Sequence, residues 1–258
     1  MNPTQLFNLT GRVALVTGGS RGLGLQMAEA LGEMGAKVAI TARKANELEA
    51  AQAHLKGMGI EVLTHACDLS DPAAAEPLLD KVVGQWGTLD VLINNAGATW
   101  GAPAEEHPLD AWQKVINLNL TAMFVLSQLA GKKVMIPRKA GKIINIASIA
   151  GYSGTDPHFM PTIAYNTSKA GVINFTKSLA AEWARHGIHV NGIAPGVFPS
   201  KMSKGMIDRA EQYILDHTPM RRMGTDQDLK GVTVLLASRA SDFMTGVTIP
   251  VDGGFSAL

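Results

Sequence analysis

Short apolar runs alternate with longer amphipathic stretches along almost the whole chain. The apolar runs span four to six residues and show little of the in-and-out alternation of a strand with one wet face. The longer stretches repeat apolar residues at helical spacing, and glycine follows several of them. This pattern predicts strands that are covered on both faces, with a helix between each strand and the next.

The pattern defines seven strands and six helices. The predicted strands are Arg12–Thr17, Lys37–Thr41, Glu61–Ala66, Leu89–Asn94, Lys142–Ala147, His189–Ala194 and Val247–Val251. The predicted helices are Arg21–Met34, Ala45–Lys56, 71–86, 109–135, 163–185 and 226–238. Strands separated by helices pair in parallel through right-handed crossovers, so we expect a doubly wound, Rossmann-like α/β sheet. Because no repeat or linker interrupts the pattern, residues 1–258 are expected to form a single domain.

Charge and cysteine content narrow the classes of partner and compartment. The 258 residues carry 23 basic and 22 acidic side chains, a balance that gives no reason to expect nucleic acid or an anionic membrane as a partner. Cys67 is the only cysteine, and the first residues lack a basic and then apolar leader pattern. We therefore expect a cytoplasmic protein without a membrane span. The seven histidines match no metal-binding motif, so no metal site is expected.

A glycine-rich turn joins the first predicted strand to the helix after it. Its residues are Gly18, Gly19, Ser20, Arg21, Gly22, Leu23 and Gly24. The spacing is Gly-x-x-x-Gly-x-Gly, which differs from the Gly-x-Gly-x-x-Gly of many dinucleotide sites. Glycine lets the backbone approach a pyrophosphate, whose charge the start of a helix favours. The turn indicates nucleotide binding, with an ordinary glycine-rich turn as the alternative.

The end of the second predicted strand indicates which nicotinamide cofactor is used. An NAD site carries an acid about twenty residues beyond the glycine turn, where it binds the ribose 2′-hydroxyl. This chain has Thr41-Ala-Arg-Lys44 there, without an acid. Arg43, together with Arg21, offers planar donors that suit a 2′-phosphate. The alternative is two solvated surface arginines, and the missing acid favours NADP(H).

Two more strand ends fit the same nucleotide. Asp68 and Leu69 follow the third predicted strand, where a carboxylate can meet an adenine amino group. Asn95, Ala96 and Gly97 follow the fourth strand, and small residues there leave room for a ribose. Either group alone would indicate only an ordinary turn. Together with the glycine turn, both groups favour a nucleotide-binding site.

A tyrosine and a lysine share one helix face. Tyr165 and Lys169 are four residues apart at the start of a predicted helix, seventeen residues after Ser148 at the end of a strand. A free tyrosine has a pKa near ~10, and a neighbouring ammonium favours the phenolate. Alone, such a pair is a weak signal. Beside Ser148 and a nucleotide-binding turn, it predicts acid/base chemistry on a carbonyl or alcohol.

These motifs, in this order, resemble the short-chain dehydrogenase/reductase family across essentially the whole chain. The matching stretches are Thr17–Gly24, Asp68, Asn94–Gly97, Asn119, Ser148, Tyr165–Lys169, Pro195-Gly196 and Asp252–Gly254. The resemblance implies that Tyr165 is the acid/base and that Ser148 hydrogen-bonds the substrate oxygen. It implies that Lys169 lowers the tyrosine pKa and holds the nicotinamide ribose, and that Asn119 positions a water that relays protons.

The resemblance also implies contacts at the nicotinamide end. After Pro195 and Gly196, Phe198 and Ser200 would meet the carboxamide and the phosphate on the nicotinamide side. Within the family the chain is similar to 3-oxoacyl thioester reductases of the rhamnolipid-pathway type. It departs from the family in residues 149–164, a loop several residues longer than usual that borders the substrate.

Apolar residues around the expected substrate site favour an apolar ketone, with a 3-oxoacyl thioester as the first choice. The residues behind this expectation are Trp100, His158, Phe159, Met160, Met202, Met206, Met220 and Met223. The methionines could equally be core filling. The alternative substrates are sugars, polyols or hydrophobic secondary alcohols of an NADP-linked dehydrogenase. An alternative of another class is an NADP(H)-binding sensor without turnover.

Assembly and carrier docking are the remaining expectations. The predicted helices 109–135 and 163–185 carry more apolar residues than one sheet face needs, Phe124 and Phe175 among them. By resemblance, such helices pair across two-fold axes and give a homotetramer. Lys132-Lys133 and Arg138-Lys139 would suit an acidic carrier protein, with a solvated turn as the alternative.

Overall fold

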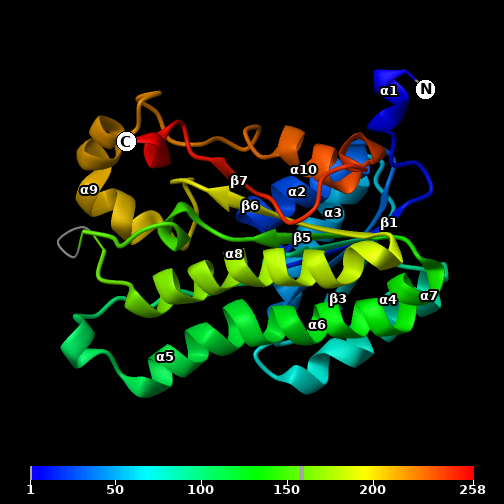
Figure 1. Cartoon of the computed structure of the whole chain (residues 1–258), viewed down its shortest axis with the longest axis horizontal. Helices are drawn as coiled ribbons and strands as arrows, with labels where there is room; N and C mark the ends of the chain where they lie inside the picture. The colour runs from blue at the N-terminus through cyan, green and yellow to red at the C-terminus, as the bar shows by residue number, and fades with distance from the viewer. Residues whose placement is uncertain (1, 157–159) are drawn as a thin grey trace.

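The computed structural model describes residues 2–156 and 160–258, and it confirms the predicted α/β class (Figure 1). Seven strands form one parallel sheet in the order β3-β2-β1-β4-β5-β6-β7. They are β1 (Val13–Thr17), β2 (Lys37–Ala42), β3 (Val62–Ala66), β4 (Val91–Asn94), β5 (Gly141–Ile146), β6 (Ile188–Pro195) and β7 (Thr248–Val251). Each predicted strand is present, and its ends differ from the prediction by two residues at most.

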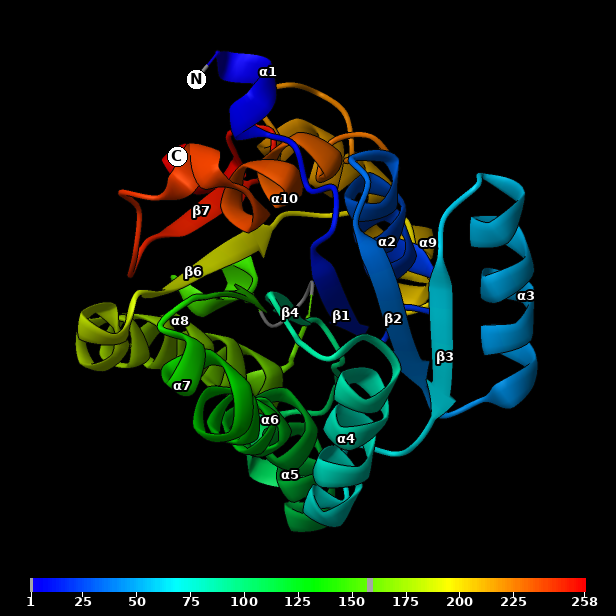
Figure 2. The ribbon, with the colours of Figure 1, turned by 90° about the vertical axis from the view of Figure 1, so that its right-hand side faces the viewer.

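Helices cover both faces of the sheet (Figure 2). One face carries α2 (Gly22–Glu33), α3 (Ala45–Gly57) and α10 (Lys230–Ala237). The other carries α4 (Ala75–Trp86), α5 (Leu109–Ile116), α6 (Ala122–Ala130) and α8 (Ile163–Trp183). The remaining helices are α1 (Pro3–Leu6), α7 (Ile136–Arg138) and α9 (Lys204–His217).

The core lies in two layers, one on each side of the sheet, and β1 contributes to both. Ala14 and Val16 pack with residues of α2, α3 and α10. Val13 and Leu15 point the other way and pack with residues of α4 and α6. Because both faces of the strand are covered, its sequence is apolar without alternation, as the pattern predicts.

The chain reverses its direction of travel beside β1. It runs outward from β1 to β2 and β3 and then returns to place β4 on the other side of β1. Val16 of β1 pairs with Ile93 of β4, so both strands end at the same level. The carboxyl edge beside these two strands is where doubly wound sheets bind ligands.

The helices depart from the prediction in two places. Two π-helical turns, Asn117–Thr121 and Gly131–Met135, interrupt the predicted helix 109–135. The helix α9 is absent from the prediction, although apolar residues recur at helical spacing in its sequence (Met206, Ile207, Ala210, Tyr213 and Ile214) and only Ile214 of them is buried in the fold. Non-helical backbone at Ala210 also divides α9 into two pieces.

Candidate active site

A cavity of about 880 Å³ opens at the carboxyl edge of the sheet, within the size range of ligand sites. Its lining includes these predicted residues: Gly18, Ser20, Arg21, Gly22, Leu23, Gly24, Arg43, Asp68, Leu69, Asn95, Ala96, Gly97, Ser148, Tyr165, Lys169, Pro195, Gly196, Phe198 and Ser200. Gly19 and Asn119 are the two predicted site residues outside this lining. A Cβ on Gly19 would lie 2.7 Å from Ile40 Cγ2, so this glycine serves close packing behind the turn.

The glycine turn presents bare backbone to the cavity. Gly18 and Gly22 have φ angles of +66° and +53°, which glycine adopts without strain. A Cβ on Gly24 would lie 2.3 Å from the Gly18 carbonyl oxygen, so only glycine fits where α2 crosses the turn. A Cβ on Gly22 would meet just one atom within 4 Å, the Ser200 Cβ at 3.9 Å. A helix start without side chains in front of it fits a pyrophosphate.

Hydrogen bonds hold the loop after β4 against the glycine turn. Thr17 Oγ1 accepts from the backbone N–H groups of Asn95 and Ala96, both at 2.9 Å. The Asn95 amide donates to the Thr17 carbonyl at 2.8 Å and to the Gly18 carbonyl at 3.3 Å. These bonds set the spacing between two walls of the cavity.

Charged side chains gather at the end of the cavity beside β2 and β3. Arg43 lies 3.8 Å from Asp68, and Arg21 lies 2.7 Å from Glu47 on α3. Burial raises the pKa of Asp68, but hydrogen bonds from Ser70 and the Arg43 guanidinium outweigh it and hold that pKa below its usual range. Asp68 is therefore ionised at neutral pH, and both arginines are positioned to meet an anion at this end.

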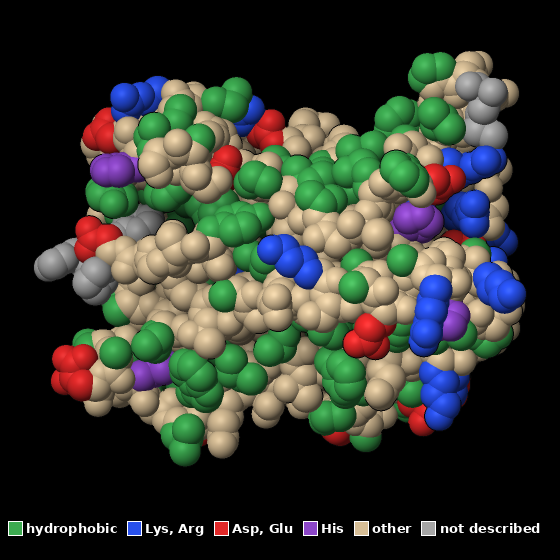
Figure 3. All heavy atoms as spheres, in the orientation of Figure 1, with side chains coloured by type: hydrophobic (Ala, Val, Ile, Leu, Met, Phe, Trp, Pro, Cys, Tyr) green, Lys and Arg blue, Asp and Glu red, His purple; other side chains and the backbone are tan. Residues whose placement is uncertain are grey.

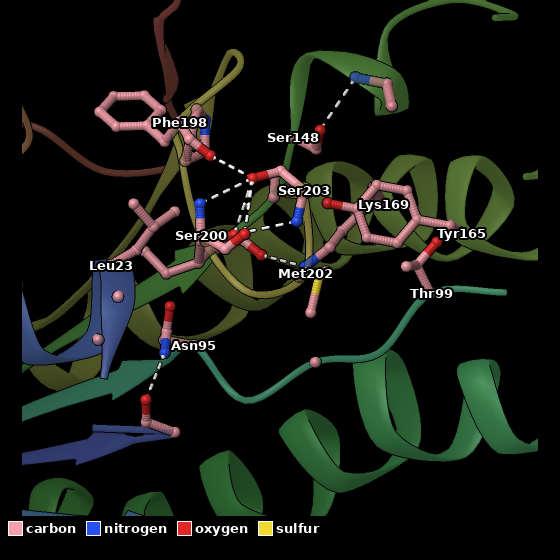
Figure 4. Close-up of a pocket in the computed structure, with 18 of the residues that line it drawn as sticks. Leu23, Asn95, Thr99, Ser148, Tyr165, Lys169, Phe198, Ser200, Met202 and Ser203 are labelled. Atoms are coloured by element: carbon pink, nitrogen blue, oxygen red, sulfur yellow. Dashed lines mark hydrogen bonds between the residues drawn. The ribbon is translucent and has the colours of Figure 1, made fainter. Parts of the chain in front are cut away.

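Tyr165, Lys169 and Ser148 meet near the middle of the cavity (Figure 4). The two α8 residues project inward, and Lys169 Nζ donates to the Ile146 carbonyl at 2.6 Å. Burial raises the pKa of Tyr165, and a hydrogen bond with the Ser148 side chain opposes that rise. Burial lowers the pKa of Lys169 to about 8. A phenol, a hydroxyl and an ammonium in this arrangement can deliver a proton to a carbonyl oxygen.

Asn119 lies behind this group, fully buried in the π-helical turn between α5 and α6. Its amide oxygen accepts from the Ala98 N–H at 2.7 Å, and its amide nitrogen donates to the Ala98 carbonyl and the Ser168 hydroxyl, both at 2.9 Å. The side chain therefore ties the loop after β4 to α8. Such π-turns are frequent at functional sites.

The segment after β6 closes one side of the cavity. Ser200 and Ser203 bond each other reciprocally, and Ser203 Oγ also donates to the Phe198 carbonyl at 2.6 Å. The Phe198 ring turns into the core, where a Cβ on Gly224 would lie 2.3 Å from it (Figure 4). Met202 lies beside the cavity at the start of the path into α9.

A model of the short chain dehydrogenase family matches residues 12–211, the range that holds the glycine turn, Ser148, Tyr165 and Lys169. The chain belongs to the short-chain dehydrogenase family. It is an oxidoreductase of that family, and the predicted resemblance is confirmed.

Relatives within the family act on different substrates. Gluconate 5-dehydrogenase of Gluconobacter oxydans is 37% identical over 99% of this chain and 99% of its own. The rhamnolipid 3-oxoacyl-[acyl-carrier-protein] reductase of Pseudomonas aeruginosa is 38% identical over 96% of this chain and 98% of its own. A crystal structure of a gluconate 5-dehydrogenase from Burkholderia cenocepacia, in complex with NADP and tartrate, superposes with a TM-score of 0.93 at 33% identity, covering 100% of both chains.

Several cavity residues are absent from the sequence-based prediction. Glu47, Lys201 and Tyr152 line the cavity, as do Phe255 and Leu258 near the carboxyl end of the chain. Because Lys201 directly follows the predicted site residue Ser200, the sequence could have indicated that Lys201 also lines the cavity. Nothing in the sequence pattern indicates that residues 255–258 fold back over the site.

The predicted apolar wall of the substrate site is only partly present. Trp100 is 43% exposed and does not line the cavity. Met160, Met202 and Met206 do line it, whereas Met220 and Met223 do not. His158 and Phe159 lie outside the described residues. Fewer of the predicted apolar residues line the cavity than the sequence indicates, which weakens the argument for an apolar substrate.

Basic side chains on the face seen in Figure 3 gather at the end of the molecule where α8 ends, away from α9. Two of the predicted carrier-docking residues hold acidic partners within the chain. Lys133 Nζ lies 2.6 Å from Glu76 and 2.8 Å from Asp80, and Arg138 lies 3.0 Å from Asp90.

Among residues 2–156 and 160–258, no helix is long and apolar enough to cross a bilayer, and no group of three potential metal ligands is found.

Proposed function

We propose that this chain is an NADP(H)-dependent oxidoreductase that interconverts a secondary hydroxyl and a ketone on a polyhydroxy acid of the gluconate class. The observation that carries the reaction type is the convergence of Ser148, Tyr165 and Lys169 on the cavity that the glycine turn lines. Once bound, NADPH supplies the hydride for the carbonyl carbon.

The residues around the cavity fit the cofactor. Gly22 leaves the start of α2 bare for the pyrophosphate, and Arg21 and Arg43 would hold the 2′-phosphate. Asp68 would accept from the adenine amino group, while Asn95 and the small residues after it would border a ribose. The NADP bound to the Burkholderia relative supports this choice of cofactor.

In the reducing direction, Tyr165 would give its proton to the carbonyl oxygen, and Ser148 would donate a hydrogen bond to that same oxygen. Lys169 would bind the nicotinamide ribose and return a proton to the phenol. Asn119 would hold the backbone of its π-turn in position to bind a water molecule. That water would pass protons to Lys169. All four side chains are present, which favours turnover over a binding protein that only senses NADP(H).

Polar groups on the substrate side favour a polyhydroxy acid over an acyl chain. Ser153, Thr155 and Lys201 line the cavity beyond Tyr165. Lys201 holds no ion pair among the described residues, so its ammonium is available to a carboxylate. A buried hydroxyl of the substrate needs fixed polar partners because each unpaired one costs ~1–3 kcal/mol. The gluconate and tartrate in the names of two relatives have this chemistry.

A 3-oxoacyl thioester is the second candidate. Met160, Met202 and Met206 line the same cavity and could pack against a short alkyl chain. The Pseudomonas reductase is as similar in sequence as the gluconate enzyme.

The test is a substrate panel with the purified chain, followed by nicotinamide fluorescence. It compares gluconate with NADP⁺, keto-gluconates and neutral ketoses with NADPH, and 3-oxoacyl-CoA esters of increasing length. The highest kcat/KM is expected for the gluconate pair. Efficiency that rises with acyl length would favour the thioester instead, and NADPH binding without turnover on any substrate would favour the sensor.

A further inference from the structure

The phosphate end of the cavity contains a carboxylate that the proposed chemistry does not use. Glu47 lies in the first turn of α3 and lines the cavity together with Arg21, Arg43 and Lys44. Its Oε1 is 2.7 Å from Arg21 Nη1 and 3.4 Å from Lys44 Nζ. The Glu47 side chain is 24% exposed, whereas those of Arg21 and Lys44 are 50% and 58% exposed. One partly buried acid therefore engages two of the three cations at this end.

These contacts oppose the binding of a 2′-phosphate. A phosphate needs the guanidinium donors of Arg21, and the Glu47 carboxylate already accepts from one of them. The carboxylate also adds a negative charge beside the phosphate in a cavity that is partly shielded from water. NAD(H) has a hydroxyl in place of the phosphate and meets no such competition.

We propose that Glu47 is a specificity-determining residue that competes with the cofactor 2′-phosphate for Arg21 and Lys44 and so limits the preference for NADP(H) over NAD(H). The proposal rests on the proposed use of NADP(H). It differs from the role of Arg43, which has a separate partner in Asp68 at 3.8 Å. The Glu47 carboxylate thus acts as a counter-ion within the pocket, and the chain can bind both NADP(H) and NAD(H).

The test measures binding of two small probes that differ only in the phosphate, adenosine 2′,5′-bisphosphate and adenosine 5′-monophosphate. In Glu47→Gln, which keeps the side-chain shape and removes the charge, the Kd of the bisphosphate should fall by about threefold or more, the scale of an exposed ion pair. The Kd of the monophosphate should stay within experimental error. Calorimetry gives both values without turnover, and the kcat/KM ratio of NADPH to NADH should rise in parallel.

Two further variants control for structure. Glu47→Asp keeps the charge and should keep most of the wild-type discrimination. Glu49→Gln alters an exposed acid two residues further along α3 that lies outside the cavity lining, and it should change neither Kd. The melting temperature of each variant checks that α3 remains folded.

The outcomes separate this proposal from the one it rests on. If wild type prefers the bisphosphate and Glu47→Gln leaves that preference unchanged or weakens it, Glu47 orients Arg21 and the competition proposal is wrong. If wild type does not distinguish the two probes, the proposed NADP(H) use fails, and this proposal fails with it.

Discussion

The Lys169 ammonium nitrogen lies 5.6 Å from the centre of the Tyr165 ring. With a pKa of about 8, this buried lysine is largely protonated at neutral pH, and a cation so placed favours the phenolate. Burial is nevertheless the largest influence on Tyr165, and it raises the pKa, with the Ser148 hydrogen bond opposing it. Tyr165 therefore holds its proton at neutral pH. The lowering of the tyrosine pKa by Lys169 stays a prediction.

Replacing Tyr165 by Phe should separate turnover from binding. The ring remains and the proton is lost, so kcat should fall about 10²-fold or more while the Kd of NADPH stays near wild type. Tyr152→Phe is the matched control, because Tyr152 lines the same cavity but donates its hydroxyl to the Thr248 carbonyl at 3.0 Å. Near-normal turnover in Tyr165→Phe would show that another group moves the proton.

Lys169→Met should remove activity and also change how stability depends on pH. The folded protein holds Lys169 with a pKa of about 8, against an ordinary value of 10.5. Below pH 8 both states carry the charge, and the folded state bears the full desolvation penalty. Between about pH 8 and 10.5 the folded state releases the proton first, so this group's contribution to stability rises with pH.

The free energy of unfolding of wild type, relative to Lys169→Met, should therefore rise by about 2–3 kcal/mol from pH 7 to pH 10. Urea unfolding at several pH values measures this difference. Lys177→Met is the control, since Lys177 is exposed on the same helix. A difference that stays flat across this range would mean that Lys169 titrates as an ordinary lysine.

The sequence predicts the sheet well for a physical reason. Its inner strands are buried on both faces, so uninterrupted apolar runs mark them, as in β1 and β4. The helix α9 is absent from the prediction although its apolar residues recur at helical spacing, and only Ile214 of them is buried. The π-turn around Asn119 is also absent from the prediction, because helical spacing across 109–135 predicts one continuous helix and does not distinguish a π-turn from an α-helical turn.

The same reasoning explains what could be predicted of the site. Gly22, Ser148 and Tyr165 follow strands or begin helices, positions that the strand pattern fixes to one edge of the sheet. Glu47 and Lys201 reach the cavity through side-chain direction and loop path, which periodicity does not encode. Substrate selection depends on residues of this second kind, and this is why the reaction type is easier to predict than the substrate.

Arg43→Asp should reverse the cofactor preference. The change removes a cation from the expected 2′-phosphate site and installs an acceptor for the ribose 2′-hydroxyl, so kcat/KM should fall for NADPH and rise for NADH. Steady-state kinetics with both cofactors provides the measurement. Arg185→Asp, in the turn that follows α8, should change neither value. A wild-type enzyme that already prefers NADH would contradict the assignment of Arg21 and Arg43.

Assembly should depend on the outer surface of α6 and α8. Phe124 is 46% exposed and packs edge to face on Phe175 with ring centres 6.4 Å apart, leaving an aromatic surface without cover in one chain. We propose that this surface joins subunits of a homotetramer. Light scattering should give four times the 27.3 kDa chain mass for wild type and less for Phe124→Lys. Met58→Lys alters an exposed apolar residue at the end of α3 and should leave the mass unchanged. A monomeric wild type at micromolar concentration would contradict the proposal.

Lys201 should select substrates that carry a carboxylate. It lines the cavity directly after Ser200, and it differs from Lys204, which holds Asp208 at 2.8 Å. Because the Lys201 side chain is exposed, an ion pair formed there should contribute about a threefold to fivefold gain in affinity. In Lys201→Met, KM for gluconate should therefore rise about threefold to fivefold with kcat little changed, because the contact is made equally in the ground and transition states.

The matched substrate is a neutral polyol of similar length, for which KM should change less than about twofold. Lys201→Arg should restore most of the affinity for gluconate, and Lys204→Met should behave as wild type. The KM of NADPH is followed in each variant, because Ser200 is expected to contact the cofactor phosphate. Equal losses for gluconate and the polyol would assign Lys201 to general packing or to the cofactor, and the carboxylate of the substrate would then need another partner.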